Sequence, residues 1–260
     1  MSVNTANGSL LSTLSDIDGI GLPTLSAVNG QSLALTDPHF ASVVFLSHFD
    51  GSDASTTVTD EKSHTVTCVG NAQLDTAQQK FGSASLLLDG TGDYITVPDS
   101  NEWTPGADFT IEGWVRFAAL TGNHVFCSHY ENTTNMRSWF FRRTTGDLLT
   151  FQIHPFSGGS NPNSPEIAQG AWAPVINTWY HVAVTRSGNA YRVFAAGSLI
   201  GSNTTPFGPT NSNQPLVFGA INSSGFTQFL NGWMDDWRIT NGVARYTGAF
   251  TPPVAPFPNS

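Results

Sequence analysis

The amino-acid sequence predicts an all-β fold, built as a sandwich of two antiparallel sheets. Charged residues make up only 11% of the 260 residues, so helix formers such as Lys and Glu are scarce, while 18 Phe and 7 Trp favour strands. Apolar and polar residues alternate with a period of two in many short stretches. Turn residues separate these stretches at short intervals, which is typical of a sheet built from hairpins and short loops.

The clearest strand prediction covers residues 109–117, which read FTIEGWVRF. The odd positions hold Phe, Ile, Gly, Val and Phe, whereas the even positions are mostly polar, so one face of this strand is expected to be buried. Trp114 interrupts the alternation. The opposite face is therefore expected to be partly covered as well, as in one sheet of a sandwich.

Turn residues indicate where the other predicted strands begin and end. The apolar residues 84–88 and 94–97 flank the sequence DGTGD, which predicts a hairpin because Asp and Gly tolerate positive φ. Turns at residues 144–147 and 187–189 predict two more hairpins. Residues 154–178 are rich in Pro, Gly, Ser and Asn and are predicted to form a long, functional loop. The remaining strands are predicted at residues 42–49, 56–60, 64–69, 124–128, 137–143, 148–153, 180–186, 190–195, 215–220 and 232–239.

Residues 1–40 are predicted to form an N-terminal arm, followed by one domain at residues 41–260. The arm contains an 11-residue repeat, with LSDIDG at residues 14–19, LSAVNG at residues 25–30 and a degenerate copy at residues 3–8. A repeat this short buries too little apolar surface to order itself, so it needs neighbours. We therefore predict an attachment or oligomerisation arm, with a flexible tail as the alternative.

Composition argues against several classes of partner. The net charge of −9 argues against nucleic acid, because a phosphate backbone needs clustered Lys and Arg. No run of about 20 apolar residues is present, so no membrane insertion is expected. The N-terminus lacks the basic and apolar regions of a secretory signal. Cys68 and Cys127 are predicted to be buried thiols in strands, with a disulfide as the alternative.

Three groups of motifs follow one another along the chain. Residues 81–117 contain FGSAS, DGTGDY and DFTIEGWV, residues 177–186 read NTWYHVAVTR, and residues 230–239 read LNGWMDDWRI. In order and spacing, these motifs resemble the laminin-G-like branch of the concanavalin A-like jelly rolls. The resemblance covers most of residues 42–253 and implies that the predicted sandwich is a jelly roll.

The most specific phrase lies near the C-terminus, where residues 245–253 read RYTGAFTPP. It is similar to tails on phage-borne members of the same family, and the repeat in the arm resembles those at the N-terminus of tailed-phage virion proteins. The resemblance implies a virion location, as a tail fibre or a head decoration. It also implies that residues 1–40 contact other virion proteins in a homo-oligomer, for which a trimer is favoured by analogy with phage fibres.

Five aspartates form a candidate calcium set. Ca²⁺ takes about 6–8 oxygen ligands from carboxylates and carbonyls, and jelly rolls of the resembled family often place such a site where the loop after the first strand meets the last strand. In a strand, Asp235 and Asp236 point to opposite faces, so at most one side chain is expected to bind. The alternative is that these carboxylates make Asx-turns or cap loops. The candidate metal ligands are Asp50, Asp53, Asp60, Asp235 and Asp236, and calcium is the one cofactor considered.

Aromatic residues near the long loop form a candidate sugar-stacking platform. Phe156 and Trp172 lie in the loop itself and are favoured, whereas core packing is the stronger alternative for Trp139 because that residue lies in a regular strand. Arg142 and Arg143 could contact acidic sugars or form a solvated strand end. The candidate ligand-binding residues are Tyr130, Trp139, Phe156, Trp172 and Arg142.

No enzyme motif is visible in the sequence. Glycoside hydrolysis needs two converging carboxylates, and the Glu-x-Asp-x-x-Glu strand of related glycosidases is absent. Nucleophile-elbow, zinc-protease and phosphate-loop motifs are absent too. We therefore predict a non-enzymatic virion protein whose jelly roll binds host-surface glycans. The alternatives are a secreted carbohydrate-binding module or glycan-active enzyme, and a purely structural capsid-stabilising protein, since jelly rolls host many functions.

Overall fold

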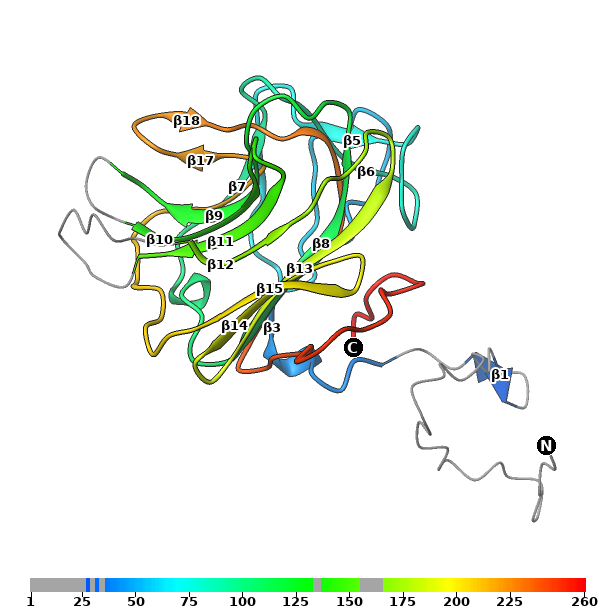
Figure 1. Cartoon of the computed structure of the whole chain (residues 1–260). Helices are drawn as coiled ribbons and strands as arrows, with labels where there is room; N and C mark the ends of the chain where they lie inside the picture. The colour runs from blue at the N-terminus through cyan, green and yellow to red at the C-terminus, as the bar shows by residue number, and fades with distance from the viewer. Residues whose placement is uncertain (1–26, 29–30, 33–35, 133–136, 155–165) are drawn as a thin grey trace, which may run out of the picture.

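Two large antiparallel sheets packed face to face form the body of the protein (Figure 1). The computed structural model describes residues 27–28, 31–32, 36–132, 137–154 and 166–260. In these ranges the only helices are two short 3-10 turns, η1 (Phe40–Ser42) and η2 (Asn101–Trp103). The predicted all-β sandwich is therefore confirmed. Neither helix of the described residues has the length and apolar character needed to cross a bilayer.

One sheet has seven strands. Its members are β4 (Thr67–Val69), β7 (Tyr94–Val97), β9 (His124–Tyr130), β10 (Arg137–Arg143), β11 (Leu148–Ile153), β12 (Glu166–Ala171) and β16 (Leu216–Phe218). Their order across the sheet is β12, β11, β10, β9, β16, β7, β4. Two short strands, β17 (Ile221–Asn222) and β18 (Phe226–Thr227), pair with each other directly after β16.

The second sheet has eight strands. Its members are β3 (Val43–Ser47), β5 (Gln73–Asp75), β6 (Ser85–Asp89), β8 (Phe109–Phe117), β13 (Trp179–Ser187), β14 (Ala190–Ala195), β15 (Ser198–Thr204) and β19 (Asn231–Asn241). The order is β15, β14, β13, β8, β19, β6, β5. One edge of β19 pairs with β8, and the other edge pairs first with β6 and then with β3. The long strand β19 therefore ties the start of the domain to its end.

The core lies between the sheets, as the alternation in β8 predicts. Phe109, Ile111 and Val115 are fully buried in it. Gly113 occupies the same face, and the indole of Trp237 fills the space that a side chain at this position would need. Each large apolar side chain buried this way stabilises the fold by about 1.5–3 kcal/mol, so the inward face of β8 contributes strongly to stability.

A buried ion-pair cluster lies on the outer face of the eight-stranded sheet. Glu112 of β8 accepts hydrogen bonds from Arg238 Nη2 at 2.7 Å and from the hydroxyl of Tyr246 at 2.8 Å. Asp37 accepts hydrogen bonds from Arg238 Nη1 at 3.0 Å and from Arg245 Nη2 at 2.6 Å. Residues before β3 and after β19 are thus held on the same face of the sheet.

Residues 245–253, which read RYTGAFTPP, cover part of this outer face. Tyr246 and Phe250 stack with ring centroids 3.5 Å apart, and both rings pack against Phe194 and His181. Figure 1 shows this C-terminal segment, in red, alongside the blue segment that leads into β3. Trp114 on the same face is only 6% exposed, so the predicted covering of the second face is confirmed.

The turn at residues 89–93 does not close a hairpin, so that prediction is wrong. β6 and β7 belong to different sheets, and the turn carries the chain from one sheet to the other. Residues 89–93 do form a tight turn. Gly90 has a φ of 86°, and the carboxylate of Asp93 accepts a hydrogen bond from the backbone N–H of Asp89 at 3.0 Å. A tight turn alone does not oblige its flanking strands to pair. The hairpins predicted at residues 144–147 and 187–189 are confirmed by the pairings β10–β11 and β13–β14.

The strands differ from the predictions at several places, and the short strands β5, β17 and β18 were not predicted. β12 lies inside the segment predicted as a long loop, and β15 was not predicted, because both have little of the aromatic and β-branched content that marks strands. Residues 56–60 form no strand. There, the carboxylate of Asp60 accepts the backbone N–H groups of Leu46 and His64, at 2.9 and 3.0 Å, and holds this segment as a loop.

The two cysteines are free thiols in β4 and β9, which confirms the predicted thiols in strands, whereas the predicted burial is confirmed for Cys127 alone. Cys127 is buried and Cys68 is half-buried. β7 and β16 lie between their strands, so at about 4.8 Å per strand step the thiols are roughly 14 Å apart, beyond the reach of a disulfide. The repeat predicted in the arm lies largely outside the described residues, of which β1 (Ala27–Val28) and β2 (Gln31–Ser32) form a small antiparallel pair.

Candidate functional site

Three rings pack together on the outer face of the seven-stranded sheet, away from the core. Tyr130 at the end of β9 lies 5.1 Å from the ring of His154 and 5.4 Å from the ring of Phe140, measured between centroids. Alternation along β10 turns Trp139 and Phe141 into the core and leaves Phe140 facing outward. The three outer rings are between 4% and 8% exposed, so they form a floor and do not protrude.

Polar side chains stand around this floor. The guanidinium of Arg142 lies 4.9 Å from the centroid of Phe140 and donates from Nη1 to Gln228 Oε1 at 2.9 Å. Gln152 Nε2 lies 3.2 Å from His154 Nε2. Arg142, Gln152 and Gln228 are each half-buried, so part of each side chain stays accessible. We call this group the outer-face cluster, and its members are Tyr130, Phe140, Arg142, Gln152, His154 and Gln228.

Burial keeps the floor of the outer-face cluster uncharged. It lowers the pKa of His154 to about 4, and the positive charge of Arg137 acts in the same direction. Burial also raises the pKa of the Tyr130 hydroxyl. Both side chains are therefore neutral near pH 7, and Arg142 carries the positive charge. An apolar aromatic floor with a few oriented polar groups suits a small polar ligand such as a sugar.

The structure separates the residues that the sequence suggests for sugar stacking. Tyr130 and Arg142 come together in the outer-face cluster. Trp139 has no exposed surface, and Trp172 is 9% exposed and belongs to the core between the sheets. The core-packing alternative therefore describes both tryptophans, and the five residues do not form one platform. Phe156 lies outside the described residues.

Sequence reasoning missed four members of this cluster, namely Phe140, Gln152, His154 and Gln228. Phe140 could have been predicted from the sequence, because it lies two residues before Arg142 in β10 and alternation places both side chains on the same face. Gln228 could not, because it follows β18 and reaches Arg142 only through the tertiary fold. Arg143, considered together with Arg142, is 4% exposed and donates to the carbonyl of Leu120 at 2.8 Å. It is thus neither a ligand contact nor a solvated strand end.

Three of the five predicted calcium ligands stabilise loops. The Oδ1 atom of Asp50 accepts hydrogen bonds from the hydroxyl of Ser83 at 3.0 Å and from the backbone N–H of Ala84 at 3.4 Å. Asp60 holds the loop between Leu46 and His64, as described above. Asp53 accepts hydrogen bonds from the backbone N–H and the hydroxyl of Thr76 at 3.1 and 3.2 Å. These contacts correspond to the turn and capping alternative.

A β-bulge separates Asp235 from Asp236. The register of β19 against β8 shifts between Asp235 and Arg238, and Asp236 adopts a φ of 49°. The regular alternation of faces that was expected for this pair is therefore interrupted. Asp236 accepts the backbone N–H of Phe257 at 2.9 Å and lies 2.6 Å from His48 Nδ1, so it anchors the C-terminal segment.

Asp235 is the predicted ligand whose surroundings fit a cation. Its Oδ2 accepts the backbone N–H groups of Lys80 and Phe81, whereas its Oδ1 is buried and has no hydrogen-bond partner among the described residues. Burial raises its pKa to about 8, and the negative charges of Asp236 and Asp50 act in the same direction. An orphaned carboxylate oxygen close to a second carboxylate suits Ca²⁺, which Asp50 and Asp235 would hold. In the described part of the chain no three His, Cys, Asp or Glu side chains converge, so backbone carbonyls and water would complete the shell.

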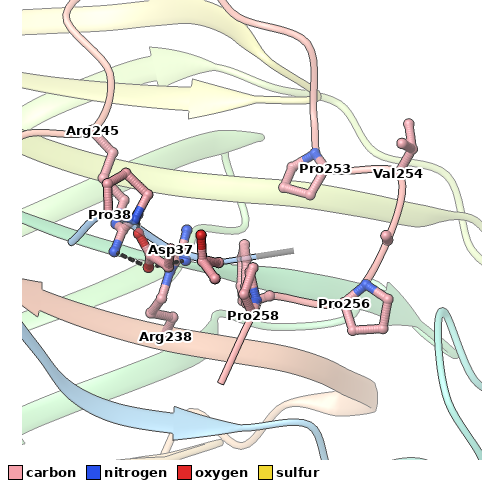
Figure 2. A pocket seen from close by; sticks show the side chains of 11 residues that line it. Asp37, Pro38, Arg238, Arg245, Pro253, Val254, Pro256 and Pro258 are labelled. Atoms are coloured by element: carbon pink, nitrogen blue, oxygen red, sulfur yellow. Dashed lines mark hydrogen bonds and ion pairs between the residues drawn. The ribbon is translucent and has the colours of Figure 1, made fainter. Parts of the chain in front are cut away.

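A hollow of about 370 Å³ lies where the C-terminal segment meets the residues before β3 (Figure 2). Figure 2 shows proline and valine side chains on its rim and the ion pairs of Asp37 with Arg238 and Arg245 on its floor. Because those charges are paired within the protein, the hollow offers a ligand mainly apolar contact. The lining residues with apolar side chains are Pro38, Pro253, Val254, Ala255, Pro256, Phe257 and Pro258.

Comparison with known proteins identifies the family. Residues 89–245 match the model of the Laminin_G_3 family, described as the concanavalin A-like lectin/glucanases superfamily. This match covers more than half of the chain and includes β8, β13 and β19 in full. Among curated proteins, none matches the chain in sequence.

Solved structures share the fold at low sequence identity. Domain 4 of AbnA, a GH43 extracellular arabinanase from Geobacillus stearothermophilus, in complex with arabinotriose, has a TM-score of 0.56 and 20% identity, over 81% of this chain and 95% of that one. The binding domain of botulinum neurotoxin DC in complex with SialylT has a TM-score of 0.55 and 15% identity, over 77% and 48%. The binding domain of Paraclostridial Mosquitocidal Protein 1 has a TM-score of 0.55 and 15% identity, over 80% and 50%.

These similarities establish the fold. The chain spans about half the length of the two toxin binding domains and nearly all of the arabinanase domain. The two-sheet antiparallel sandwich agrees with both comparisons. With the family match over residues 89–245, the chain belongs to the Laminin_G_3 family of concanavalin A-like lectin/glucanase domains.

Proposed function

We propose that the protein is a non-enzymatic glycan-binding protein of a tailed-phage particle, a tail fibre or capsid decoration whose jelly roll binds host-surface glycans. The observation that carries glycan binding is the placement of Arg142 and Gln228, which are joined by a hydrogen bond beside the ring of Phe140. A guanidinium and an amide in fixed orientation offer the donors and the acceptor that sugar hydroxyls need, and the buried ring of Phe140 beneath them holds the guanidinium in place.

The neighbouring structures support the same function. Two of them contain a bound glycan by description, arabinotriose in the arabinanase domain and SialylT in the neurotoxin domain. A binding role rather than catalysis is proposed because the six members of the outer-face cluster include no carboxylate, whereas glycoside hydrolysis normally uses two. The virion setting, with residues 1–40 as the contact to other virion proteins, rests on the sequence resemblance of the arm and of RYTGAFTPP.

Arg142→Gln in the full-length protein tests the proposed site. The wild-type protein is screened against an array of bacterial-surface oligosaccharides, and the tightest ligand is titrated by calorimetry. The substitution removes a charged donor but keeps a polar side chain. It should weaken binding about tenfold or more, because a hydrogen bond to a charged group contributes about 1.5–3 kcal/mol.

Arg192→Gln on β14 is the matched control, and it should leave both affinity and melting temperature unchanged. Full affinity in a folded Arg142→Gln variant would show that the ligand binds elsewhere. If the wild-type protein binds no glycan in the screen, the glycan-binding proposal is wrong. If it releases shortened products from the bound oligosaccharide, the protein is an enzyme.

A further inference from the structure

Two tryptophans and an arginine form a row across the outer face of the eight-stranded sheet. Strand register places Trp179 of β13 beside Arg116 of β8, and Arg116 beside Trp233 of β19. The sequence neighbours Val115 and Met234 lie in the core, so the row faces outward. All three side chains are half-buried and keep part of their surface accessible. We call Trp179, Arg116 and Trp233 the tryptophan row; it lies on the opposite sheet from the outer-face cluster.

The C-terminal segment covers the neighbouring part of this face. Phe250 and Phe257 pack edge-on against His181, which lies in the next outward-facing row along the sheet. Trp114 in that row is covered in turn by Lys80, whose ammonium lies 4.1 Å from the centroid of the indole. In the tryptophan row, by contrast, the two indoles on either side of Arg116 remain partly accessible.

Arg116 is held in the row without a carboxylate partner. Its Nη1 donates to the backbone carbonyl of Asn177, and its Nη2 donates to Asn177 Oδ1 at 3.2 Å. Its Nε is buried and has no hydrogen-bond partner among the described residues. The side chain forms no ion pair with any described carboxylate, and the guanidinium lies 5.4 Å from the centroid of Trp233. Asp75 contacts the row, and its carboxylate accepts a hydrogen bond from the indole N–H of Trp233 at 2.7 Å.

We propose that the tryptophan row binds an acidic saccharide, with the sugar carboxylate on Arg116 and the apolar faces of sugar rings on Trp179 and Trp233. A planar guanidinium matches a carboxylate in charge and geometry. Indole rings present flat apolar surfaces to the C–H groups of a pyranose. The two tryptophans are separated by one intervening strand, so they lie roughly 10 Å apart and leave room for a sugar ring at Arg116.

The loop before β13 extends this surface. Val175 and Ile176 are 58% and 48% exposed, which is unusual for residues of their size in this chain. They directly precede Asn177, whose oxygens hold Arg116. An accessible apolar edge beside an unneutralised cation fits a ligand that has both a carboxylate and an apolar face, rather than a simple inorganic anion.

Titration of the full-length protein with two matched probes, trigalacturonic acid and galactotriose, tests this inference. Tryptophan fluorescence and calorimetry report binding. The wild-type protein should bind the acidic trisaccharide at least about tenfold more tightly than the neutral one, since a charge-assisted contact is involved. Arg116→Gln should remove this preference while leaving the affinity for galactotriose unchanged, and Trp233→Phe should weaken both.

Controls separate this site from the outer-face cluster. Arg192→Gln on β14 should keep the preference for the acidic probe, and Arg116→Gln should still remove this preference when it is combined with Arg142→Gln on the opposite sheet. Arg116→Lys, which keeps the charge but loses the planar fork, should retain part of it. Circular dichroism of each variant excludes unfolding, and Arg116→Lys decides the matter if Arg116→Gln does not fold. Equal affinity for both probes, no binding of the acidic probe, or the same loss in Arg192→Gln would overturn the inference and leave glycan binding at Arg142 untouched.

Discussion

Glu112 shows at the scale of one residue how the fold tolerates a buried charge. It has no exposed surface, and burial alone would raise its pKa. The positive charges of Arg238 and Arg245, together with the imidazole of His181, whose Nε2 lies 3.3 Å from Glu112 Oε2, outweigh burial, so the pKa of Glu112 falls to about 2. This carboxylate is therefore ionised at every pH at which the protein is expected to be folded.

The lowered pKa of Glu112 predicts how the free energy of unfolding depends on pH. The pKa of Glu112 is lower in the folded chain than its ordinary value of 4.5, so its contribution is fully present above that value and is lost as the pH falls toward 2. Urea unfolding followed between pH 5 and 2 should show this loss. Glu112→Gln should cost about 3–5 kcal/mol at neutral pH, because it removes one of the two buried carboxylates that neutralise Arg238 and Arg245. Glu102→Gln, at a carboxylate that is 49% exposed, is the control and should cost almost nothing.

The Asp50–Asp235 pair predicts a calcium dependence that strengthens with pH. The pKa of Asp235 is raised to about 8, so without metal its ionisation makes the fold less stable as the pH rises from about 4 to 8. A bound cation would reverse that trend, because it favours the ionised form. Millimolar calcium should therefore raise the melting temperature, and the shift should be larger at pH 8 than at pH 6.

Substitutions distinguish a calcium site from a carboxylate that only caps a loop. Asp50→Ala should remove the response to calcium and to EDTA, whereas Asp53→Ala should keep it, because Asp53 bonds to Thr76. Identical melting curves with calcium and with EDTA at both pH values would favour the capping alternative.

At the scale of secondary-structure elements, two glycines let the sheets meet along one edge. β12 at the edge of the seven-stranded sheet lies against β15 at the edge of the eight-stranded sheet. A Cβ on Gly170 would collide with the backbone of Ile200, and a Cβ on Gly201 would collide with the backbone of Gln169. Since both obstacles are backbone atoms, neither can move without separating the sheets.

This contact predicts the effect of a single methyl group. Gly201→Ala should destabilise the protein by about 1–3 kcal/mol, the cost typical of overpacking. Chemical denaturation of the variant measures it. Gly146→Ala in the β10–β11 turn is the control, because a Cβ there meets only Thr144 Oγ1 at 3.7 Å. A Gly201→Ala variant as stable as Gly146→Ala would mean that the two edges are not in backbone contact.

The sequence predicts elements better than it predicts how they meet. Period-two alternation locates β8 and β19 because the pattern is local, and the turns at residues 144–147 and 187–189 pair strands that are also neighbours in the sheet. The turn at residues 89–93 looks the same locally, yet its strands diverge into different sheets. That outcome depends on β19, which supplies the partner of β6 from far along the chain.

The same limit applies to the candidate sites. Tyr130 and Arg142 could be suggested from their residue types, but Gln228 joins them from a distant segment. The inward direction of Trp139 follows from its parity in β10, whereas the sequence offers no sign that a bulge would interrupt β19 at Asp236. Residue types indicate which side chains could bind, and the register between strands decides which ones meet.

At the scale of the whole molecule, the predicted arm and the jelly roll share a contact at Asp37. This residue falls inside residues 1–40 but is only 7% exposed and pairs with Arg238 and Arg245 on the sheet. A cut after residue 40 would therefore remove the arm together with a buried carboxylate, whereas a cut after residue 35 would remove the arm alone.

Two deletions test the separate roles of the arm and of Asp37. Removal of residues 1–35 should give a folded, monomeric jelly roll with an unchanged melting temperature that no longer joins virions. Removal of residues 1–40 should also lower the melting temperature, because it leaves two arginines without Asp37. Light scattering, thermal melts and labelling of assembled particles check these outcomes. Normal incorporation of the shorter deletion would place the anchoring surface on the sandwich itself.

The hydrogen bond from the backbone N–H of Asp37 to the backbone oxygen of Ser260, 2.6 Å long, brings two distant positions of the chain together. A jelly roll in which these two positions touch can be joined there by a short linker and reopened at an exposed turn. The turn around Gly188 between β13 and β14 is suited to this, because the space around a Cβ there is open. The same geometry would let the domain be inserted into a surface loop of a carrier protein.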